Sequence, residues 1–369
     1  MAIKKITIQQ FLELAKHNPV LDVRSPGEYA HAHIPNAYSQ PLFTDEERKI
    51  VGTAYKQKGK QIAIKLGLDF FGVKMKAMVE EAEGIIKNDE LRIENDASSN
   101  SKPSIQNSKF KIQNSILVHC WRGGMRSAGV AWLLDLYGFD VYTLVGGYKA
   151  YRNWVLKQFE MDFNLFVVGG YTGSGKTALL EELQRKNQAV IDLEKLANHK
   201  GSAFGAMGEQ PTQEMFENSL ANELYKYEGI DTSIWLEDES QRIGSLNIPH
   251  NFWKTMRTKP IWFIDIPFDQ RLHYITSTYG LNDKEQLVNA IIRIQKRLGP
   301  LETKTAIGFL IEDNFKSCFE ILLHYYDKSY TKALNNRENL DTLLNKIDCS
   351  FVDTTSNTEK LLSCATVNI

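Results

Sequence analysis

The chain has 369 residues, the length of about two ordinary domains. Hydrophobic residues make up 43% and charged residues 24%, as in globular proteins, and the sequence has no run of about 18 uncharged apolar residues that could cross a membrane. The net charge of −1 argues against a protein that coats nucleic acid, but it hides an asymmetry: residues 1–160 carry 22 Lys and Arg against 17 Asp and Glu (+5), and residues 161–369 carry 22 against 28 (−6).

The N-terminal segment lacks the long apolar stretch and the small residues of a secretory signal. After it, short apolar strands at Val20–Val23, Ile116–His119 and Val141–Leu144 are separated by helical patterns such as Ala128–Tyr137. Strands that alternate with helices favour a parallel sheet. Residues 1–158 are therefore predicted to form a first α/β domain.

A stretch at 87–115 interrupts this pattern. It is rich in Asn, Ser and Lys, and the tetrapeptide Ile-Gln-Asn-Ser occurs in it twice, at 105–108 and 112–115. Such low complexity predicts a poorly ordered insertion, to which we assign no chemistry.

Residues 159–369 again alternate strands and helices and are predicted to form a second α/β domain. Helices are expected at 178–187 and 212–227, and helical patterns near the C-terminus extend over 269–347. The expected strands are Asn164–Val168, Ala189–Asp192, Ser233–Leu236, Pro260–Ile264 and Ser350–Asp353. The sequence thus predicts a second parallel sheet with a helical elaboration.

The cysteines (Cys120, Cys318, Cys349 and Cys364) are too scattered for a disulfide framework, so we expect a reducing, cytoplasmic setting. Cys120 stands between a predicted strand and a predicted helix, where loop amides and two arginines would lower its pKa. Two glycines after it would let the backbone curl around an anion. Cys120 is the candidate catalytic residue, and the candidate anion-binding loop is Trp121, Arg122, Gly123, Gly124, Met125, Arg126 and Ser127.

A second glycine-rich segment matches the phosphate-binding pattern G-x-x-x-x-G-K-[ST]. It consists of Gly170, Tyr171, Thr172, Gly173, Ser174, Gly175, Lys176 and Thr177. It follows a predicted strand and precedes a helix, which is the context that the pattern requires. Its amides would wrap a phosphate or diphosphate, Lys176 would add a mobile positive charge, and Thr177 is a candidate Mg²⁺ ligand.

Polar residues also follow neighbouring strands of the second domain, where ligands of parallel sheets bind. Asp192 and His199 follow one predicted strand, and Glu237, Asp238 and Arg242 follow another. These residues are candidates to support the phosphate site. A solvated acidic strand end is the competing interpretation of the second group.

The segment around Cys120 fits both cysteine-dependent phosphatases and rhodaneses, which are sulfurtransferases. Upstream, Leu21–Tyr29 and His33–Ala37 resemble the N-terminal signature of rhodanese domains, and Val145–Tyr148 resembles their closing signature. Some phosphatases share the rhodanese fold, so the resemblance implies a rhodanese-like fold for residues 1–158 and leaves the reaction open.

A rhodanese-like domain followed by a P-loop domain closely resembles the tRNA 2-selenouridine synthase family. Further matching stretches are Asp45–Gln57, Asp192–Gly205 and Glu237–Gly244, so the resemblance covers nearly the whole chain apart from the insertion. It implies a transferase that replaces the sulfur of wobble 2-thiouridine in tRNA with selenium from selenophosphate. It also implies an S-geranyl-2-thiouridine intermediate made from geranyl diphosphate, with no tightly bound cofactor and no membrane partner.

In such an enzyme the P-loop would hold the diphosphate of geranyl diphosphate, with Mg²⁺ as a candidate metal. Cys120 would handle selenium or help to expel the geranyl thiol, and Arg122 and Arg126 would hold selenophosphate. A cysteine-dependent phosphatase or sulfurtransferase fused to a nucleotide-binding P-loop module is the alternative.

A tRNA partner needs positive charge and stacking surfaces. The candidate tRNA contacts are Arg48, Lys49, Tyr55, Lys56, Lys58 and Lys60. A solvated surface helix remains the alternative for this basic stretch. Trp121 could stack on a base, or it could be a packing residue.

Overall fold

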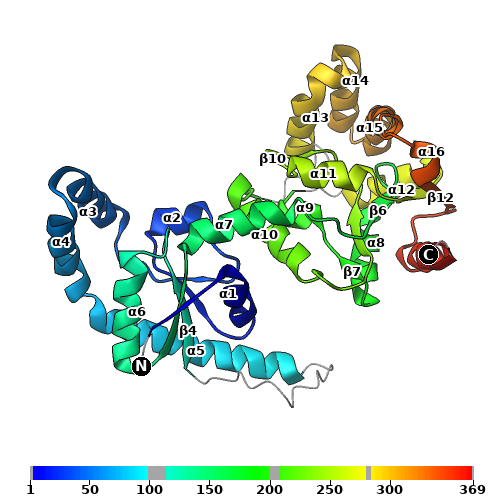
Figure 1. The fold of residues 1–369 in the computed structure, drawn as a ribbon. Helices are drawn as coiled ribbons and strands as arrows, with labels where there is room; N and C mark the ends of the chain where they lie inside the picture. The colour runs from blue at the N-terminus through cyan, green and yellow to red at the C-terminus, as the bar shows by residue number, and fades with distance from the viewer. Residues whose placement is uncertain (1–2, 99–113, 200–207, 280–283, 368–369) are drawn as a thin grey trace. The chain divides into compact units, whose positions relative to one another are not determined.

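The computed structural model describes residues 3–98, 114–199, 208–279 and 284–367. The chain divides into two compact units, residues 1–157 and 158–369, coloured blue to green and green to red in Figure 1. Each unit holds a five-stranded sheet whose paired strands all run parallel. The predicted α/β class with parallel sheets is therefore confirmed. Within the described ranges, no helix combines the length and the apolar character needed to cross a membrane.

The first sheet has the strand order β1-β5-β4-β2-β3. Its strands are β1 (Lys4–Ile6), β2 (Val20–Asp22), β3 (Tyr38–Ser39), β4 (Ser115–His119) and β5 (Asp140–Leu144). The middle strand, β4, is buried along its whole length. Since side chains alternate along a strand, Ile116 and Val118 point to one face of the sheet and Leu117 and His119 to the other.

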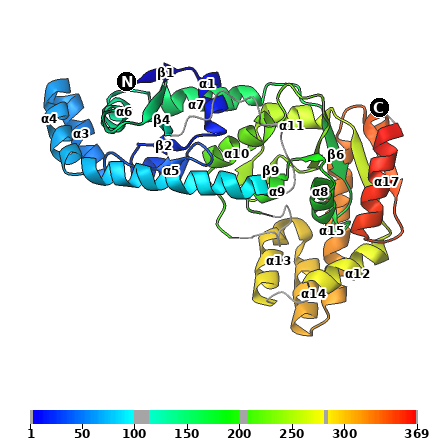
Figure 2. The same cartoon turned by 90° about the horizontal axis from the view of Figure 1, so that it is seen from below.

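Helices cover both faces of this sheet. The helices of this unit are α1 (Ile8–Ala15), α2 (Pro26–His31), α3 (Asp45–Lys58), α4 (Lys60–Gly72), α5 (Met75–Ser98), α6 (Met125–Tyr137) and α7 (Gly147–Gln158). Helices α5 and α6 bury apolar side chains such as Ala82 and Leu134 in one core with Ile116 and Val118. On the other face, Phe11 of α1 meets His119 edge to face. Figure 2 shows α5 as the long cyan helix of this unit.

The prediction of a poorly ordered insertion was wrong for its first part. Helix α5 continues through Ser98, and β4 begins at Ser115. Residues 87–98 contain Lys, Glu, Leu and Arg, which are favourable helix formers, and the polar composition of the segment concealed this propensity. The rest of the predicted insertion, 99–113, lies outside the described residues.

The second sheet has the order β12-β11-β6-β8-β7. Its strands are β6 (Leu165–Gly169), β7 (Ala189–Val190), β8 (Ile234–Glu237), β11 (Ile261–Asp265) and β12 (Leu344–Asp348). A separate antiparallel pair consists of β9 (Arg242–Ile243) and β10 (Leu246–Asn247). The predicted phosphate loop leaves the middle strand, β6, at the carboxyl edge of the sheet.

The helices of the second unit are α8 (Lys176–Arg185), α9 (Leu193–Leu196), α10 (Gln213–Tyr225), α11 (His250–Arg257), α12 (Phe268–Tyr279), α13 (Lys284–Leu298), α14 (Pro300–Ile311), α15 (Phe315–Asn335), α16 (Leu340–Leu343) and α17 (Thr354–Val367). Leu180 of α8 and Leu361 of α17 share a core with the sheet. Helices α12 to α15 have their own apolar core, which includes Ile291 and Phe319. They form the helical elaboration, seen in yellow and orange in Figure 2.

The predicted last strand at Ser350–Asp353 was wrong. The last strand is β12, which pairs with β11 from Ile261 opposite Leu344 to Asp265 opposite Asp348. As an edge strand, β12 buries only Ile347 and therefore lacks the apolar run that marks the inner strands. The segment after it is a loop, in which Asp353 accepts a hydrogen bond from the Ser356 amide at 2.7 Å.

Candidate functional site

Cys120 and the candidate anion-binding loop Trp121–Ser127, together called the cysteine loop, connect the middle strand β4 to α6 and include the first residues of that helix. Cys120 Sγ lies 3.3 Å from the Gly124 amide nitrogen and 3.2 Å from Ser127 Oγ. The cysteine is only 3% exposed, whereas Trp121 and Met125 are 38% and 50% exposed. The loop therefore covers the sulfur and presents its own outer residues to solvent.

Two opposing effects set the pKa of Cys120. Burial raises the pKa, but hydrogen bonds from the Ser127 hydroxyl and from the amides of Ser127, Gly124 and Arg122 outweigh it, so the pKa lies below its ordinary value. Ser127 Oγ is also 3.1 Å from the Gly124 carbonyl oxygen. Its single hydrogen can turn from that carbonyl to the sulfur when the thiol ionises. The loop is therefore built to stabilise a thiolate.

The two loop arginines lie in different surroundings. Arg126 Nη1 is 2.7 Å from Glu28 Oε2, and Arg48 Nε is 2.9 Å from the same oxygen. Arg122 is exposed. Burial raises the pKa of Glu28, but the bonds from Arg126 and the charge of Arg48 dominate and hold the pKa at about 2. The hydroxyl and the amides, rather than the guanidinium groups, are thus the main stabilisers of the Cys120 thiolate.

The turn at Gly146 and Gly147, which follows β5, is hydrogen-bonded to the cysteine loop through the residues after it. The amide of Tyr148 donates to the Cys120 carbonyl at 2.8 Å, and the amide of Lys149 donates to the Trp121 carbonyl at 3.0 Å. Gly147 has a φ of 58°, and a Cβ at this position would lie 2.3 Å from the Cys120 carbonyl oxygen. Only glycine fits there, because the turn and the loop share one hydrogen-bonded surface.

A buried ion pair packs against Tyr148, the residue that follows this turn. Arg24 and Asp22, both fully buried, make a two-pronged pair with Nε–Oδ1 at 2.9 Å. The Arg24 guanidinium stacks 3.8 Å from the centre of the Tyr148 ring, and Trp121 packs on that ring at 5.6 Å. Trp121 is therefore a packing residue that keeps part of its surface exposed.

The phosphate loop occupies the same position in the second unit, between the middle strand β6 and helix α8. Gly170, Gly173 and Gly175 all have positive φ, and a Cβ on Gly173 would lie 2.7 Å from Ile275 Cδ1. Lys176 Nζ donates to the Gly170 carbonyl at 2.8 Å. This folds the lysine side chain back along the loop, within reach of an anion held by the loop amides.

The other loop residues are held by their neighbours. Ser174 is buried, and its Oγ lacks a hydrogen-bond partner among the described residues. Tyr171 Oη is 3.2 Å from Thr331 Oγ1, and Thr172 accepts a hydrogen bond at its carbonyl from Arg271 at 3.0 Å.

Carboxylates gather beside Thr177. The Thr177 hydroxyl donates to Glu194 Oε2 at 3.2 Å, and the Glu194 amide donates to Glu237 Oε1 at 2.8 Å. Burial, followed by the charges of Asp192, Glu239 and Glu194, raises the pKa of Glu237 well above its usual range. Burial and the charge of Glu194 likewise raise the pKa of Glu239 to about 8, although Lys176 opposes this. The negative charges of these carboxylates therefore repel one another, and a bound cation would reduce that repulsion.

These oxygens fit Mg²⁺, which is usually held by one or two carboxylates and the substrate phosphates. Glu237 Oε2 is buried and has no hydrogen-bond partner among the described residues. Among the residues that the structure describes, no group of three or more His, Cys, Asp or Glu side chains is arranged so that it could hold a metal ion by itself. Thr177 and Glu194 would therefore hold the ion together with a bound diphosphate.

The remaining predicted supports lie at different places. Asp192 caps α9 by accepting from the Lys195 amide at 2.8 Å. Asp238 accepts from Tyr330 Oη at 2.6 Å and pairs with Arg337. Tyr330 Oη in turn accepts from the Gly170 amide at 3.3 Å, so Asp238 braces the start of the phosphate loop.

Arg242 belongs to the β9–β10 hairpin, where its Nε donates to the Gly244 carbonyl at 2.9 Å. His199 lies against the same hairpin, since a Cβ on Gly244 would come within 2.8 Å of His199 Cδ2. The hairpin thus brings these two predicted residues together.

Sequence reasoning placed Glu194 and Glu239 in candidate stretches without singling them out, and it did not identify Arg271 or Tyr330. The two glutamates stand within two residues of candidates that the strand ends did identify, so the same signal could have found them. Arg271 carried no local signal. It comes from α12, pairs with Asp327 of α15 at 2.7 Å and braces Thr172.

The candidate tRNA contacts all lie on the hairpin of α3 and α4. Arg48, Lys49, Tyr55, Lys56 and Lys58 are exposed on α3, and Lys60 is exposed at the start of α4. Arg48 forms an ion pair with Glu28. Lys49 and Lys56 make no ion pair with another described residue.

The second unit has the features that define a P-loop protein. A glycine-rich loop with a lysine leaves the middle strand of a parallel sheet, and the threonine that follows contacts a carboxylate. Residues 163–348 match the family model described as the tRNA 2-selenouridine synthase AAA domain.

Relatives extend the match over most of the chain. A tRNA 2-selenouridine synthase of Bdellovibrio bacteriovorus is 32% identical over 91% of this chain and 94% of the relative. One of Nitrosomonas europaea is 33% identical over 82% of this chain and 73% of the relative. The chain therefore belongs to the tRNA 2-selenouridine synthase family.

A solved structure, the N-terminal domain of a putative ATP/GTP binding protein from Clostridium difficile 630, is 37% identical over 42% of this chain and 99% of that chain, with a TM-score of 0.34.

Gly147→Ala should destabilise the first unit by about 1–3 kcal/mol, because the new Cβ meets backbone and the φ is positive. Urea unfolding followed by circular dichroism measures this. The matched control is Gly84→Ala on α5, where a Cβ meets nothing within 4 Å. Equal unfolding midpoints for the two variants would contradict the role of the turn.

The pairing of Glu28 predicts a pH dependence of stability. Because the folded-state pKa is lowered to about 2 from 4.5, the stabilisation is present above about pH 4.5 and is lost as the pH falls toward 2. Glu28→Gln should therefore be less stable than the parent chain at pH 7, and the difference should shrink below pH 4.5. Urea unfolding over a pH series tests this, with exposed Glu46→Gln as the control. A difference that stays constant over the whole range would contradict it.

Proposed function

We propose that this chain is a transferase that replaces the sulfur of wobble 2-thiouridine in tRNA with selenium from selenophosphate. The observation that carries the proposal is a thiolate-stabilising loop at Cys120 in a chain of the tRNA 2-selenouridine synthase family. Because the substrate is tRNA, we place the reaction in the cytoplasm.

We further propose that the first unit is a rhodanese-like domain. Its middle strand β4, the cysteine loop and α6 follow one another as a rhodanese active site requires. The turn at Gly146 and Gly147, which resembles the closing signature of that family, holds the loop.

In the first proposed step, the sulfur of 2-thiouridine attacks C1 of geranyl diphosphate. The C1–O bond breaks, diphosphate leaves, and N3 of the base loses its proton to water. Lys176, whose side chain folds along the loop, and the loop amides would bind the diphosphate and stabilise its growing charge. A Mg²⁺ ion beside Thr177 would add positive charge there.

In the second proposed step, selenium from selenophosphate bonds to C2 of the base, and water cleaves the P–Se bond so that inorganic phosphate leaves. Alkylation has turned a poor leaving group into one that departs as geranyl thiol, so the C2–S bond can break. The Cys120 thiolate would carry selenium or assist the departure of the thiol. Arg122 is exposed on the same loop and can bind the selenophosphate anion.

The α3–α4 hairpin is the proposed contact for tRNA phosphates. Lys49, Lys56, Lys58 and Lys60 are exposed on it, and each phosphate contact of this kind strengthens binding in a salt-dependent way.

The decisive experiment supplies the purified chain with tRNA containing 2-thiouridine, geranyl diphosphate and selenophosphate, followed by digestion and mass spectrometry of the nucleosides. We expect 2-selenouridine when both small substrates are present and S-geranyl-2-thiouridine when selenophosphate is omitted. Unchanged 2-thiouridine in every mixture would overturn the proposal.

Cys120→Ala should abolish the formation of 2-selenouridine, because the thiolate is lost. The same nucleoside analysis measures it. Cys364→Ala, a change at a partly buried cysteine of α17, is the control and should retain activity. Full selenium incorporation by Cys120→Ala would remove Cys120 from the reaction.

Lys176→Ala should abolish geranylation, because the departing diphosphate loses its mobile positive charge. The readout is S-geranyl-2-thiouridine formed without selenophosphate. Lys186→Ala, at the other end of the same helix, is the matched control. Normal geranylation by the Lys176 variant would show that the P-loop serves another ligand.

A further inference from the structure

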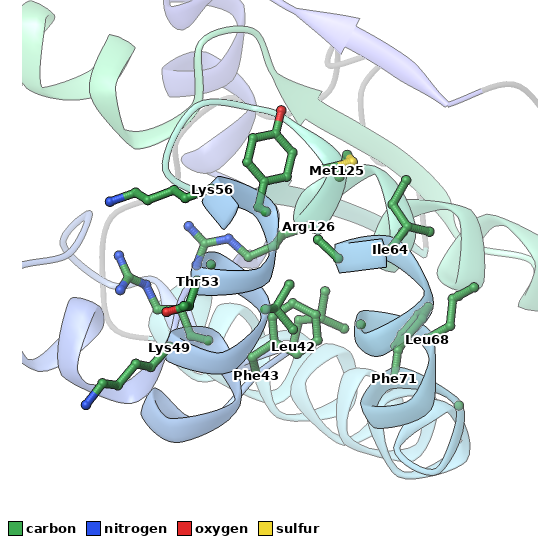
Figure 3. Close-up of a pocket in the computed structure, with 18 of the residues that line it drawn as sticks. Leu42, Phe43, Lys49, Thr53, Lys56, Ile64, Leu68, Phe71, Met125 and Arg126 are labelled. Carbon is green, nitrogen blue, oxygen red and sulfur yellow. The ribbon is translucent and has the colours of Figure 1, made fainter. Parts of the chain in front are cut away.

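The first unit contains an apolar pocket of about 820 Å³ beside the cysteine loop (Figure 3). Buried Phe43 and Phe71 line it together with Ile64 and Leu68 of α4 and Met125 of α6. This volume lies in the range of about 300–1,000 Å³ that is typical of small-molecule sites.

Glycines leave this space unfilled. Gly52 on α3 and Gly72 on α4 line the pocket, and a Cβ on either would meet nothing within 4 Å. Glycine is unfavourable inside a helix, so these positions weaken α3 and α4, and they add no side chain beside the pocket.

Large apolar side chains in the pocket remain open to water. Ile64, Leu68, Met125 and Trp132 line it and are 39%, 59%, 50% and 50% exposed. Exposed apolar residues that gather around one hollow mark a surface that gains free energy when an apolar group covers it.

Cations stand at the edge of this apolar surface. Arg48, Lys49 and Lys56 of α3 and Arg126 of the cysteine loop all line the pocket, and Figure 3 shows Lys49 and Lys56 extending outward. An apolar hollow edged by positive charges is complementary to a hydrocarbon chain attached to an anionic carrier such as RNA.

The pocket and the cysteine loop share residues. Met125 and Arg126 line the pocket, and the next residue, Ser127, contacts Cys120 Sγ at 3.2 Å. A molecule whose chain fills the pocket therefore has its attached head group near the cysteine loop.

We propose that this pocket binds the ten-carbon geranyl chain of S-geranyl-2-thiouridine in tRNA while selenium replaces the sulfur at the cysteine loop. The inference rests on the proposed function and adds the site that recognises the intermediate. The C2–Se bond forms with an electron pair from selenophosphate, and the C2–S bond breaks with its electron pair leaving on sulfur. Water then attacks phosphorus, the P–Se bond breaks and inorganic phosphate leaves, so that selenium stays on C2 and N3 of the base gains a proton. The geranyl thiolate takes a proton from water, and its chain leaves the pocket as the product is released.

Two variants test the pocket without disturbing the fold. Gly52→Leu places a side chain in open space and improves helix propensity, and Leu68→Glu puts a charge on an exposed apolar position. Their matched controls are Gly84→Leu on α5, which also meets open space, and Val73→Glu, which is 83% exposed and does not line the pocket.

The activity experiment starts from the intermediate. The full chain receives selenophosphate and an anticodon stem-loop RNA that carries S-geranyl-2-thiouridine. We expect both pocket variants to form 2-selenouridine at least about tenfold more slowly, because the chain loses its apolar contacts, while the controls match the parent chain. Geranylation of 2-thiouridine RNA by geranyl diphosphate should proceed normally in all variants.

The binding experiment distinguishes the two sources of a geranyl chain. Fluorescence titrations compare stem-loop RNA with and without the geranyl group, geranyl diphosphate and inorganic diphosphate, and Trp132→Phe assigns the signal to the pocket. The parent chain should bind geranylated RNA more tightly than 2-thiouridine RNA, and the pocket variants should lose this preference.

Pocket variants that keep both the normal rate and the preference for geranylated RNA would overturn the inference and leave the proposed function intact. Loss of geranylation with normal conversion of geranylated RNA would also overturn it, since the pocket would then serve geranyl diphosphate. If even the parent chain forms no 2-selenouridine, the proposed function fails, and the binding preference alone decides whether the pocket recognises the geranyl group.

Discussion

Both units depend on one constraint: backbone amides must converge on a point where the middle strand of a parallel sheet gives way to a helix. In the first sheet this strand is β4, and the Gly124 amide is directed at the Cys120 sulfur. In the second sheet it is β6, and the phosphate loop that follows would present its amides to a bound anion. Amides carry partial positive charge that needs no counterion, so they stabilise an anion even in a covered position. Each loop contains glycines that its neighbours require, because a Cβ on Gly123 would strike the Leu144 carbonyl oxygen at 2.5 Å and a Cβ on Gly170 would strike Ser174 Oγ at 2.6 Å.

This constraint makes each loop dependent on residues far away in the chain. The cysteine loop lies on the Gly147 turn, and a Cβ there would strike the Cys120 carbonyl. The phosphate loop is braced by Arg271 through Thr172 and by Tyr330 through the Gly170 amide. Anion binding therefore relies on hydrogen bonds to the backbone of each loop, and a change far from the sulfur or the lysine can disturb it.

The two sites differ in what surrounds the amides. Beside the phosphate loop, buried carboxylates raise one another's pKa, so a bound cation would stabilise their charged forms. Such a site fits a diphosphate that binds together with a metal ion. Beside the cysteine loop, Glu28 pairs with both Arg48 and Arg126, next to an apolar pocket with exposed lysines at its edge. One site is thus suited to a compact, highly charged group and the other to a hydrocarbon chain on an anionic carrier. That contrast supports the proposal that a prenyl group is first transferred and then expelled.

The sequence alone determined the α/β class, the inner strands and both anion loops. Apolar runs identify buried strands, and a glycine-rich segment between a strand and a helix is a local pattern. The edge strand β12 and the helical part of the predicted insertion were missed, since neither shows a strong apolar period. Only the tertiary structure decided that Asp238 braces Tyr330, that Arg271 supports Thr172, and that α3, α4 and α6 enclose a pocket. These features join residues tens to about a hundred positions apart, and local patterns carry no information on such contacts because folding, not sequence spacing, brings them together.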